Sequence, residues 1–295
     1  MPVAFVFSGQ GRTTGSMRCM IKILWGSLFL LLSACASIPS PTERHNTADA
    51  LASRQGWQSM RISAGRFDLV AYLPVSLPPA DQLTVYIEGD GFAWVTGTQP
   101  SADPTPRDPL ALRLALAQPE GNAAYLSRPC QYVDAESSSC SSRYWTEWRF
   151  APEVIEASDR AIDVLKEKFG ARQLTLVGYS GGAAVAVLVA ARRHDVTGLV
   201  TVAGNLDHQA WTTSHHIPPL AGSLNPADAR EAVQYIRQWH FVGGKDRVIP
   251  PGLVQSFAGS FPLTLKPTVQ VEPTYDHHCC WAENWPQFWR KTRGE

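Results

Sequence analysis

The sequence contains one serine whose setting would let its hydroxyl act as a nucleophile. Ser180 lies in Gly178-Tyr179-Ser180-Gly181-Gly182, between an apolar run at 173–177 and a run of small apolar residues at 183–191. In a strand, sharp G-x-S-x-G turn and helix, the serine is held above the end of the strand. A serine hydroxyl is a weak nucleophile near neutral pH, so it needs a base within hydrogen-bond distance. A glycine-rich turn without chemistry is the alternative interpretation.

Candidates for that base and for an acid that supports it follow later in the chain. Asp246 comes shortly after the apolar run 239–242, and His277 and His278 come after the last predicted strand. Histidine suits the role because its pKa lies near neutral pH, and a buried aspartate would fix the tautomer of its ring. Neighbouring side chains in an extended loop point in opposite directions, so one histidine is expected to face Ser180. We favour His277, which lies closer to the end of the preceding strand, and keep His278 as the alternative.

Segments that favour strands alternate with segments that favour helices. The predicted strands are 66–73, 83–87, 123–126, 173–177, 198–202, 239–242 and 269–271, and the predicted helices are 109–117, 151–169, 183–191, 254–258 and 281–290. This alternation predicts an α/β fold with a mostly parallel central sheet and helices on both faces. Reactive groups in such sheets lie at the carboxyl ends of strands, where Ser180, Asp246 and His277 all fall.

From about residue 60 onward the chain resembles the α/β-hydrolase superfamily, which includes the serine esterases and lipases. The resemblance rests on the G-x-S-x-G turn and on the order Ser180, Asp246, His277, which is the family's order of nucleophile, acid and histidine. It implies the α/β-hydrolase fold and cleavage of a small carboxylic ester or thioester through an acyl-enzyme, with no cofactor. Two alternatives stay open. One is a peptidase or acyltransferase with the same triad, and the other is a non-catalytic binding module of the cell envelope.

The same resemblance implies roles for residues around the nucleophile. Glu88-Gly89-Asp90-Gly91 stands where the family has His-Gly-Gly-Gly, so the backbone N–H groups of Asp90 and Gly181 are expected to form an oxyanion hole. In this family a segment placed like 205–229 forms the cap over the acyl pocket. The residues expected to contact substrate are Tyr179, His208 and Trp211.

The N-terminal residues indicate export. Residues 17–34 combine basic residues, an apolar run and small residues, as a bacterial secretory signal does, and the run is shorter than the roughly 20 residues of a spanning helix. Leu32-Ser33-Ala34-Cys35 resembles the lipobox of bacterial lipoproteins, which implies cleavage before Cys35 and a lipid on its thiol. We therefore expect a signal peptide over 1–34, with a mis-assigned start over 1–16 as an alternative.

The next segment is expected to connect the lipid to the domain. Residues 35–58 are polar and contain proline, and they are predicted to form a tether to a hydrolase domain over 59–295. Ala36 stands where an aspartate would favour retention in the inner membrane in the lipoprotein family. The resemblance therefore implies an anchor in the outer membrane and a domain that faces the periplasm.

Cysteine content and charge bound the remaining possibilities. Of the cysteines beyond Cys35, we favour a disulfide between Cys130 and Cys140, which bracket a polar loop, and leave the pairing of Cys279 and Cys280 open. No pair has the C-x-x-C spacing of a metal site, so no metal is expected. Lys plus Arg and Asp plus Glu number 26 each, without a basic run, which argues against nucleic acid as a partner. We expect a monomer.

Overall fold

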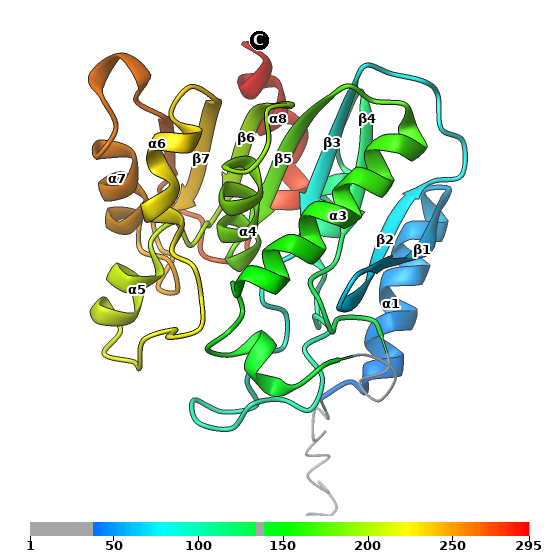
Figure 1. Ribbon diagram of the computed structural model, residues 1–295, viewed down its shortest axis with the longest axis horizontal. Coiled ribbons are helices and arrows are strands. Elements are labelled where there is room, and N and C mark those ends of the chain that lie inside the picture. Colours follow the sequence, from blue (N-terminus) through cyan, green and yellow to red (C-terminus); the bar gives the residue numbers. More distant parts are fainter. Residues whose placement is uncertain (1–37, 134–138, 295) are drawn as a thin grey trace, which may run out of the picture. The chain divides into compact units, whose positions relative to one another are not determined.

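The computed structural model describes residues 38–133 and 139–294 (Figure 1). The chain divides into two units, of which the second spans Pro39–Glu295, and the fold below is that of this second unit. The predicted signal peptide and Cys35 lie outside the described residues. Within the two described ranges, every helix is too short or too polar to cross a bilayer.

An eight-stranded sheet forms the centre of the domain, in the order β1-β2-β4-β3-β5-β6-β7-β8. The strands are β1 (Trp57–Ala64), β2 (Phe67–Pro74), β3 (Gln82–Ile87), β4 (Asn122–Leu126), β5 (Gln173–Tyr179), β6 (Val196–Val202), β7 (Arg237–Gly243) and β8 (Thr268–Glu272). β2 pairs antiparallel with both β1 and β4, and the other neighbours pair parallel. The predicted mostly parallel sheet is confirmed.

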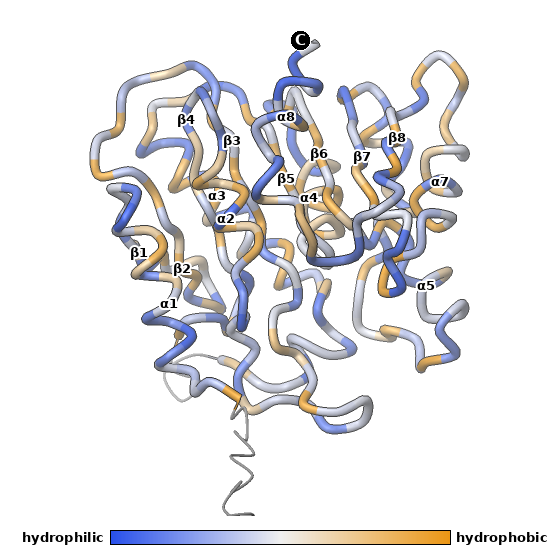
Figure 2. Tube along the Cα trace, turned by 180° about the vertical axis from the view of Figure 1, so that it is seen from behind, coloured by the Kyte–Doolittle hydropathy of each residue, from blue (hydrophilic) through white to orange (hydrophobic). Residues whose placement is uncertain are grey.

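Helices cover both faces of this sheet (Figure 1). The α-helices are α1 (Pro41–Arg54), α2 (Leu110–Leu116), α3 (Pro152–Phe169), α4 (Gly181–Ala190), α5 (His208–Ser214), α6 (Arg230–Val233), α7 (Pro251–Gly259) and α8 (Trp281–Arg293). One buried apolar cluster joins the sheet to α3, α4 and α7, and a second joins it to α1, α2 and α8. All residues of α4 are buried, and Figure 2 shows this helix as hydrophobic over most of its length.

Helix α1 replaces most of the tether predicted over 35–58. Its buried residues Arg44, Ala48 and Ala52 recur every four positions and face the domain, where the two alanines join the cluster around α2 and α8. The Arg44 guanidinium donates to the backbone oxygen of Thr105 in a neighbouring loop. The tether prediction is therefore wrong for this segment, and the folded domain begins near residue 39 instead of 59.

The start of α1 has a strong local signal. The Ser40 side chain accepts a hydrogen bond from the Glu43 backbone at 3.2 Å, and the Glu43 carboxylate accepts one from the Ser40 backbone at 2.7 Å. This reciprocal pair is a capping box, and Pro41 in the first helical position has a backbone angle suited to a helix. β1, which the sequence reading also missed, follows directly and forms a hairpin with β2.

Candidate active site

Ser180 occupies the tight turn between β5 and α4. Its backbone has φ 50° and ψ −120°, a combination that side-chain-bearing residues rarely adopt and that costs on the order of 1–3 kcal/mol. Two residues before it and two residues after it, only glycine fits. A Cβ on Gly178 would lie 2.4 Å from the Ala183 Cα, and one on Gly182 would lie 2.2 Å from the Ile87 carbonyl oxygen. The strand, turn and helix are therefore packed too closely for any other residue at these positions.

Asp246 and His277 reach Ser180 from the loops after β7 and β8. His277 Nε2 lies 3.0 Å from Ser180 Oγ, and His277 Nδ1 lies 2.8 Å from Asp246 Oδ2. The other carboxylate oxygen of Asp246 accepts hydrogen bonds at 2.8 Å from the backbone N–H groups of Val248 and Ile249. The Asp246 side chain is fully buried and that of His277 is 8% exposed. The structure thus brings together the three residues singled out from the sequence.

Backbone contacts between the loops after β7 and β8 hold the acid and the histidine near each other. The Lys245 N–H donates to the Tyr275 carbonyl at 2.8 Å, and the Gly244 N–H donates to the Glu272 carbonyl at 2.7 Å. A Cβ on Gly243 would lie 2.4 Å from the Tyr275 carbonyl oxygen, so glycine is required for this close approach. β7 and β8 are parallel neighbours, which explains why both loops leave the sheet at one edge.

His278 is turned to a different partner. Its Nδ1 lies 3.0 Å from the Tyr179 hydroxyl, while its backbone N–H and that of Cys279 donate to the Asp276 carboxylate at 2.8 and 2.7 Å. Burial, followed by the charge of neighbouring His277, lowers the pKa of His278. A disulfide joins Cys279 to Cys280 directly after it, which answers the pairing left open by the sequence.

The loop after β3 runs beside Ser180. A Cβ on Gly89 would lie 3.2 Å from the Ser180 Cβ, and the Glu88 carboxylate accepts hydrogen bonds from the N–H groups of Gly89 at 3.0 Å and Ala111 at 3.4 Å. Burial raises the pKa of Glu88 to about 7, although these hydrogen bonds act in the opposite direction. Glu88 therefore braces the loop in which the oxyanion hole is expected.

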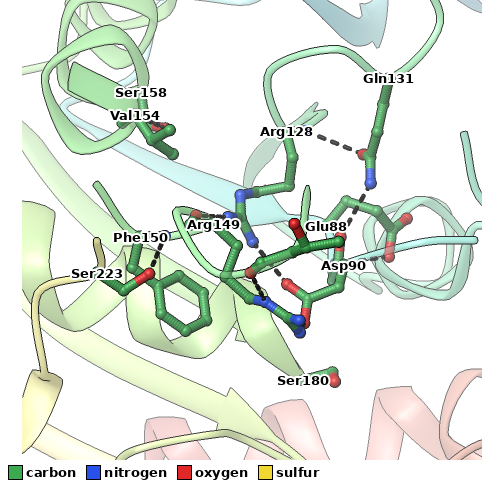
Figure 3. A network of polar contacts seen from close by, with 12 residues as sticks. Glu88, Asp90, Arg128, Gln131, Arg149, Phe150, Val154, Ser158, Ser180 and Ser223 are labelled. Atoms are coloured by element: carbon green, nitrogen blue, oxygen red, sulfur yellow. Dashed lines mark hydrogen bonds and ion pairs between the residues drawn. The ribbon is translucent and has the colours of Figure 1, made fainter. Parts of the chain in front are cut away.

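Asp90, the next polar residue of this loop, is held by two arginines (Figure 3). Its Oδ1 lies 3.3 Å from Arg128 Nη1 and its Oδ2 lies 2.5 Å from Arg149 Nη1. Burial alone would raise the pKa of Asp90, but Arg149 and Arg128 outweigh it and hold the pKa below its usual value. A Cβ on Gly181 would lie 2.1 Å from Asp90 Oδ1. The two residues expected to form the oxyanion hole are therefore neighbours in space.

Gln131 ties the same loop to the segment after β4. Its Nε2 donates to the Gly89 carbonyl at 3.0 Å, and its Oε1 accepts from the Arg128 backbone at 3.0 Å. The neighbouring Cys130 forms a disulfide with Cys140, which is the pair favoured from the sequence. Sequence reasoning did not find Arg128, Gln131 or Arg149, because they belong to no motif and reach the site only through the fold.

Ser180 and His277 open onto a cavity of about 760 Å³. Its walls combine aromatic side chains with charged ones, and Pro39, at the start of the folded unit, also lines it. The aromatic lining residues are Phe92, Trp94, Tyr179 and Trp211. Two of the three expected substrate contacts, Tyr179 and Trp211, thus line the cavity, and Trp211 is fixed by a 2.8 Å hydrogen bond from its indole N–H to the Val248 carbonyl.

His208 does not line this cavity, contrary to the expectation from the sequence. It is 3% exposed, and its ring lies 5.9 Å from that of Phe150 in the core beneath α5. Burial lowers its pKa, which favours the neutral ring. His208 is the first residue of α5 and is buried, whereas Trp211, three residues later, lines the cavity. In residues 38–133 and 139–294, no cluster of three or more His, Cys, Asp and Glu side chains is arranged to hold a metal ion.

Comparisons with known proteins bear on the fold. No family model and no curated protein matches the chain. Among solved structures, Est1E from Butyrivibrio proteoclasticus matches over 80% of this chain and 99% of its own, with TM-score 0.52 and 15% identity. An esterase from Pyrococcus furiosus matches over 81% and 90%, with TM-score 0.54 and 12% identity. An α/β serine hydrolase without lid from Xanthomonas campestris matches over 81% and 92%, with TM-score 0.51 and 13% identity. Together with the sheet topology, these matches show that the chain has the α/β-hydrolase fold.

Proposed function

We propose that the protein is a serine hydrolase that cleaves a carboxylic ester or thioester through an acyl-enzyme. The observation that carries this proposal is the hydrogen-bonded chain from Asp246 through His277 to Ser180, at 2.8 and 3.0 Å, on the wall of a cavity. A structural role alone would not require a strained serine at the one turn where a histidine can take its proton.

In the proposed reaction, His277 Nε2 takes the proton of Ser180 Oγ while the oxygen bonds to the substrate's carbonyl carbon. The electron pair of the carbonyl double bond moves to its oxygen, which the backbone N–H groups of Asp90 and Gly181 would stabilise. The bond to the leaving group then breaks, and His277 returns its proton to that group. A water molecule repeats the sequence on the acyl-enzyme and releases the acid.

Asp246 acts through the histidine. A neutral imidazole carries one proton, and a hydrogen bond to Asp246 keeps this proton on Nδ1, so that Nε2 is free to accept the serine proton. The two backbone donors on the second carboxylate oxygen keep Asp246 in the orientation that this requires.

A fluorophosphonate probe tests the proposal directly, because it labels an activated serine. The wild-type protein should be labelled and should hydrolyse short-chain p-nitrophenyl esters, and Ser180→Ala should lose both properties. Ser260→Ala, at an exposed serine after α7, is the matched control and should behave as wild type. Full labelling of Ser180→Ala would refute the assignment, and an unlabelled, inactive wild type would favour a non-catalytic binding module.

We also propose that Cys35 carries a lipid that anchors the domain to the outer membrane on the periplasmic side. The support is the lipobox-like Leu32-Ser33-Ala34-Cys35 after a short apolar run. Cys35→Ser should remove the lipid from the mature protein by mass spectrometry and move the protein from the membrane fraction to the soluble fraction. A lipid mass that persists in the variant would contradict the proposal.

A further inference from the structure

A buried cluster of charged side chains at the wall of the cavity beside Ser180 holds more positive than negative charge. Two guanidinium groups, those of Arg128 and Arg149, share the single carboxylate of Asp90. Both arginine side chains are nearly buried, at 5% and 6% exposure, so water screens their charges weakly. The three side chains together leave one positive charge that no partner within the group neutralises.

The other charged groups on the wall do not cancel this excess. Asp108 shares the Arg113 guanidinium with Glu283, at 2.8 and 2.5 Å, but these three side chains are at least 30% exposed, so solvent screens their charges more strongly than those of the two buried arginines. Glu88 has a pKa of about 7, so near neutral pH its carboxyl group is protonated and uncharged in a large fraction of the molecules. Arg107 adds another cation, which lies over the Phe92 ring at 5.8 Å and forms no ion pair with the described residues.

Arg149 is the cation of this group that lines the cavity together with Ser180. Its Nε donates to the Thr146 carbonyl at 2.6 Å and its Nη1 bonds Asp90, whereas its Nη2 has no hydrogen-bond partner among the described residues. Its guanidinium lies 5.9 Å from the Trp211 ring, which also lines the cavity. The side chain is thus fixed on three sides and retains donors for a ligand.

We propose that the preferred substrate carries an anionic group, a carboxylate or a phosphate, near its ester bond, and that Arg149 binds this group. The inference rests on the proposed hydrolase function. A neutral ester would fill the cavity and leave the excess charge without a partner, which is costly away from water, whereas an anion pairs with it. The planar fork of arginine fits carboxylate and phosphate oxygens.

Pairs of esters that differ by one charge test this. Monoethyl succinate and ethyl butyrate differ only in a carboxylate in place of a methyl group on the acyl side. The butyrate esters of 4-hydroxybutanoate and of butanol differ in the same way on the leaving-group side. Hydrolysis is followed by proton release, and the ratio of kcat/KM within each pair is the readout. A higher ratio for one pair tells which side of the ester carries the anion.

The wild type should favour the anionic member of one pair by about tenfold or more, and Arg149→Met should abolish this preference. Asp90→Asn, which removes the negative charge of the group, should raise the ratio. Arg172→Gln is the matched control, because it removes a positive charge at the opposite, amino-terminal end of β5 and should leave the ratio unchanged.

Two results would overturn the proposal. One is a wild type that favours neither anionic ester. The other is an Arg149→Met variant that slows both members of a pair equally, which would mean that the charge acts on the oxyanion. Fluorophosphonate labelling of each variant shows that it is folded with a working nucleophile. If no ester is cleaved and the wild type is not labelled, the hydrolase function itself fails.

Discussion

The two nitrogens of the His277 ring have different partners, and this difference sets the expected cost of each substitution. Asp246→Asn should lower kcat on a short-chain p-nitrophenyl ester by about 10⁴-fold, because the amide favours the wrong tautomer of the ring. His277→Ala should lower kcat by several orders of magnitude through loss of the base. Both variants should keep the circular dichroism spectrum of the wild type.

His278→Ala is the matched comparison, since His278 neighbours the base and lines the same cavity. Its ring bonds the Tyr179 hydroxyl instead of Ser180, so we expect kcat to fall much less than in His277→Ala. The opposite pattern, an active His277→Ala and an inactive His278→Ala, would retain the nucleophile and overturn the assignment of the base.

Glu88 should make the stability of the protein depend on pH. Its pKa is about 7 in the folded state against an ordinary value of 4.5, so between these values the folded state binds more protons than the unfolded state. Stability contributed by this group is therefore present at low pH and falls as pH rises from about 4.5 to 7. Glu88→Gln keeps the shape of the side chain without the titration.

Urea denaturation of both proteins at several pH values measures this effect. The free energy of unfolding of the wild type, relative to Glu88→Gln, should fall by roughly 3 kcal/mol over that range, because the pKa of Glu88 is about 7 in the folded protein and 4.5 in the unfolded one. It should then level off above pH 7. A difference that is constant with pH would mean that the pKa of Glu88 is the same in the folded and unfolded protein.

At the scale of elements, the loop after β4 couples a disulfide to the site. Cys130 pairs with Cys140, and Gln131 between them bonds the Gly89 carbonyl beside Ser180. Replacing both cysteines with serine should lower the free energy of unfolding by about 3 kcal/mol, because the unfolded chain loses a closed loop. It should also lower kcat, because Gln131 is then less firmly placed.

The double serine variant at Cys279 and Cys280 provides the control. This disulfide joins adjacent residues and closes no loop of chain, so its removal should cost little stability by the same entropic argument. Equal losses of stability in the two double variants, measured by urea denaturation, would show that loop closure is not the source of the effect.

Elements with a strong periodic or apolar pattern could be predicted from the sequence. β5, α4, β6 and β7 are largely apolar, and their predicted bounds differ from the observed ones only at the ends. α1 was missed because its buried stripe consists of two alanines and one arginine, which look polar or neutral in the sequence. The decisive term there is tertiary packing, which the local pattern does not contain.

At the scale of the whole molecule, the position of Ser180, Asp246 and His277 could be predicted because each follows a strand and parallel strands end at one edge. The cluster of Asp90, Arg128 and Arg149 beside Ser180 could not be predicted from the sequence. Arg128 and Arg149 lie 38 and 59 residues from Asp90 in the chain and meet it only after folding. His208 failed for a related reason, since its direction depends on how α5 sits over Phe150.

The early start of the folded unit has a consequence for where the cavity can work. Pro39 lines the cavity and is only four residues beyond Cys35, and a fully extended chain of four residues spans at most about 14 Å. With a lipid on Cys35, this short segment would hold the domain close to the membrane, and the cavity would meet esters in the bilayer at high local concentration. An insertion of about 20 Gly and Ser residues before Pro39 would lengthen the segment. The insertion should slow hydrolysis of long-chain esters in vesicles and leave that of soluble short-chain esters unchanged. Equal rates on vesicles would show that the length of the segment does not matter.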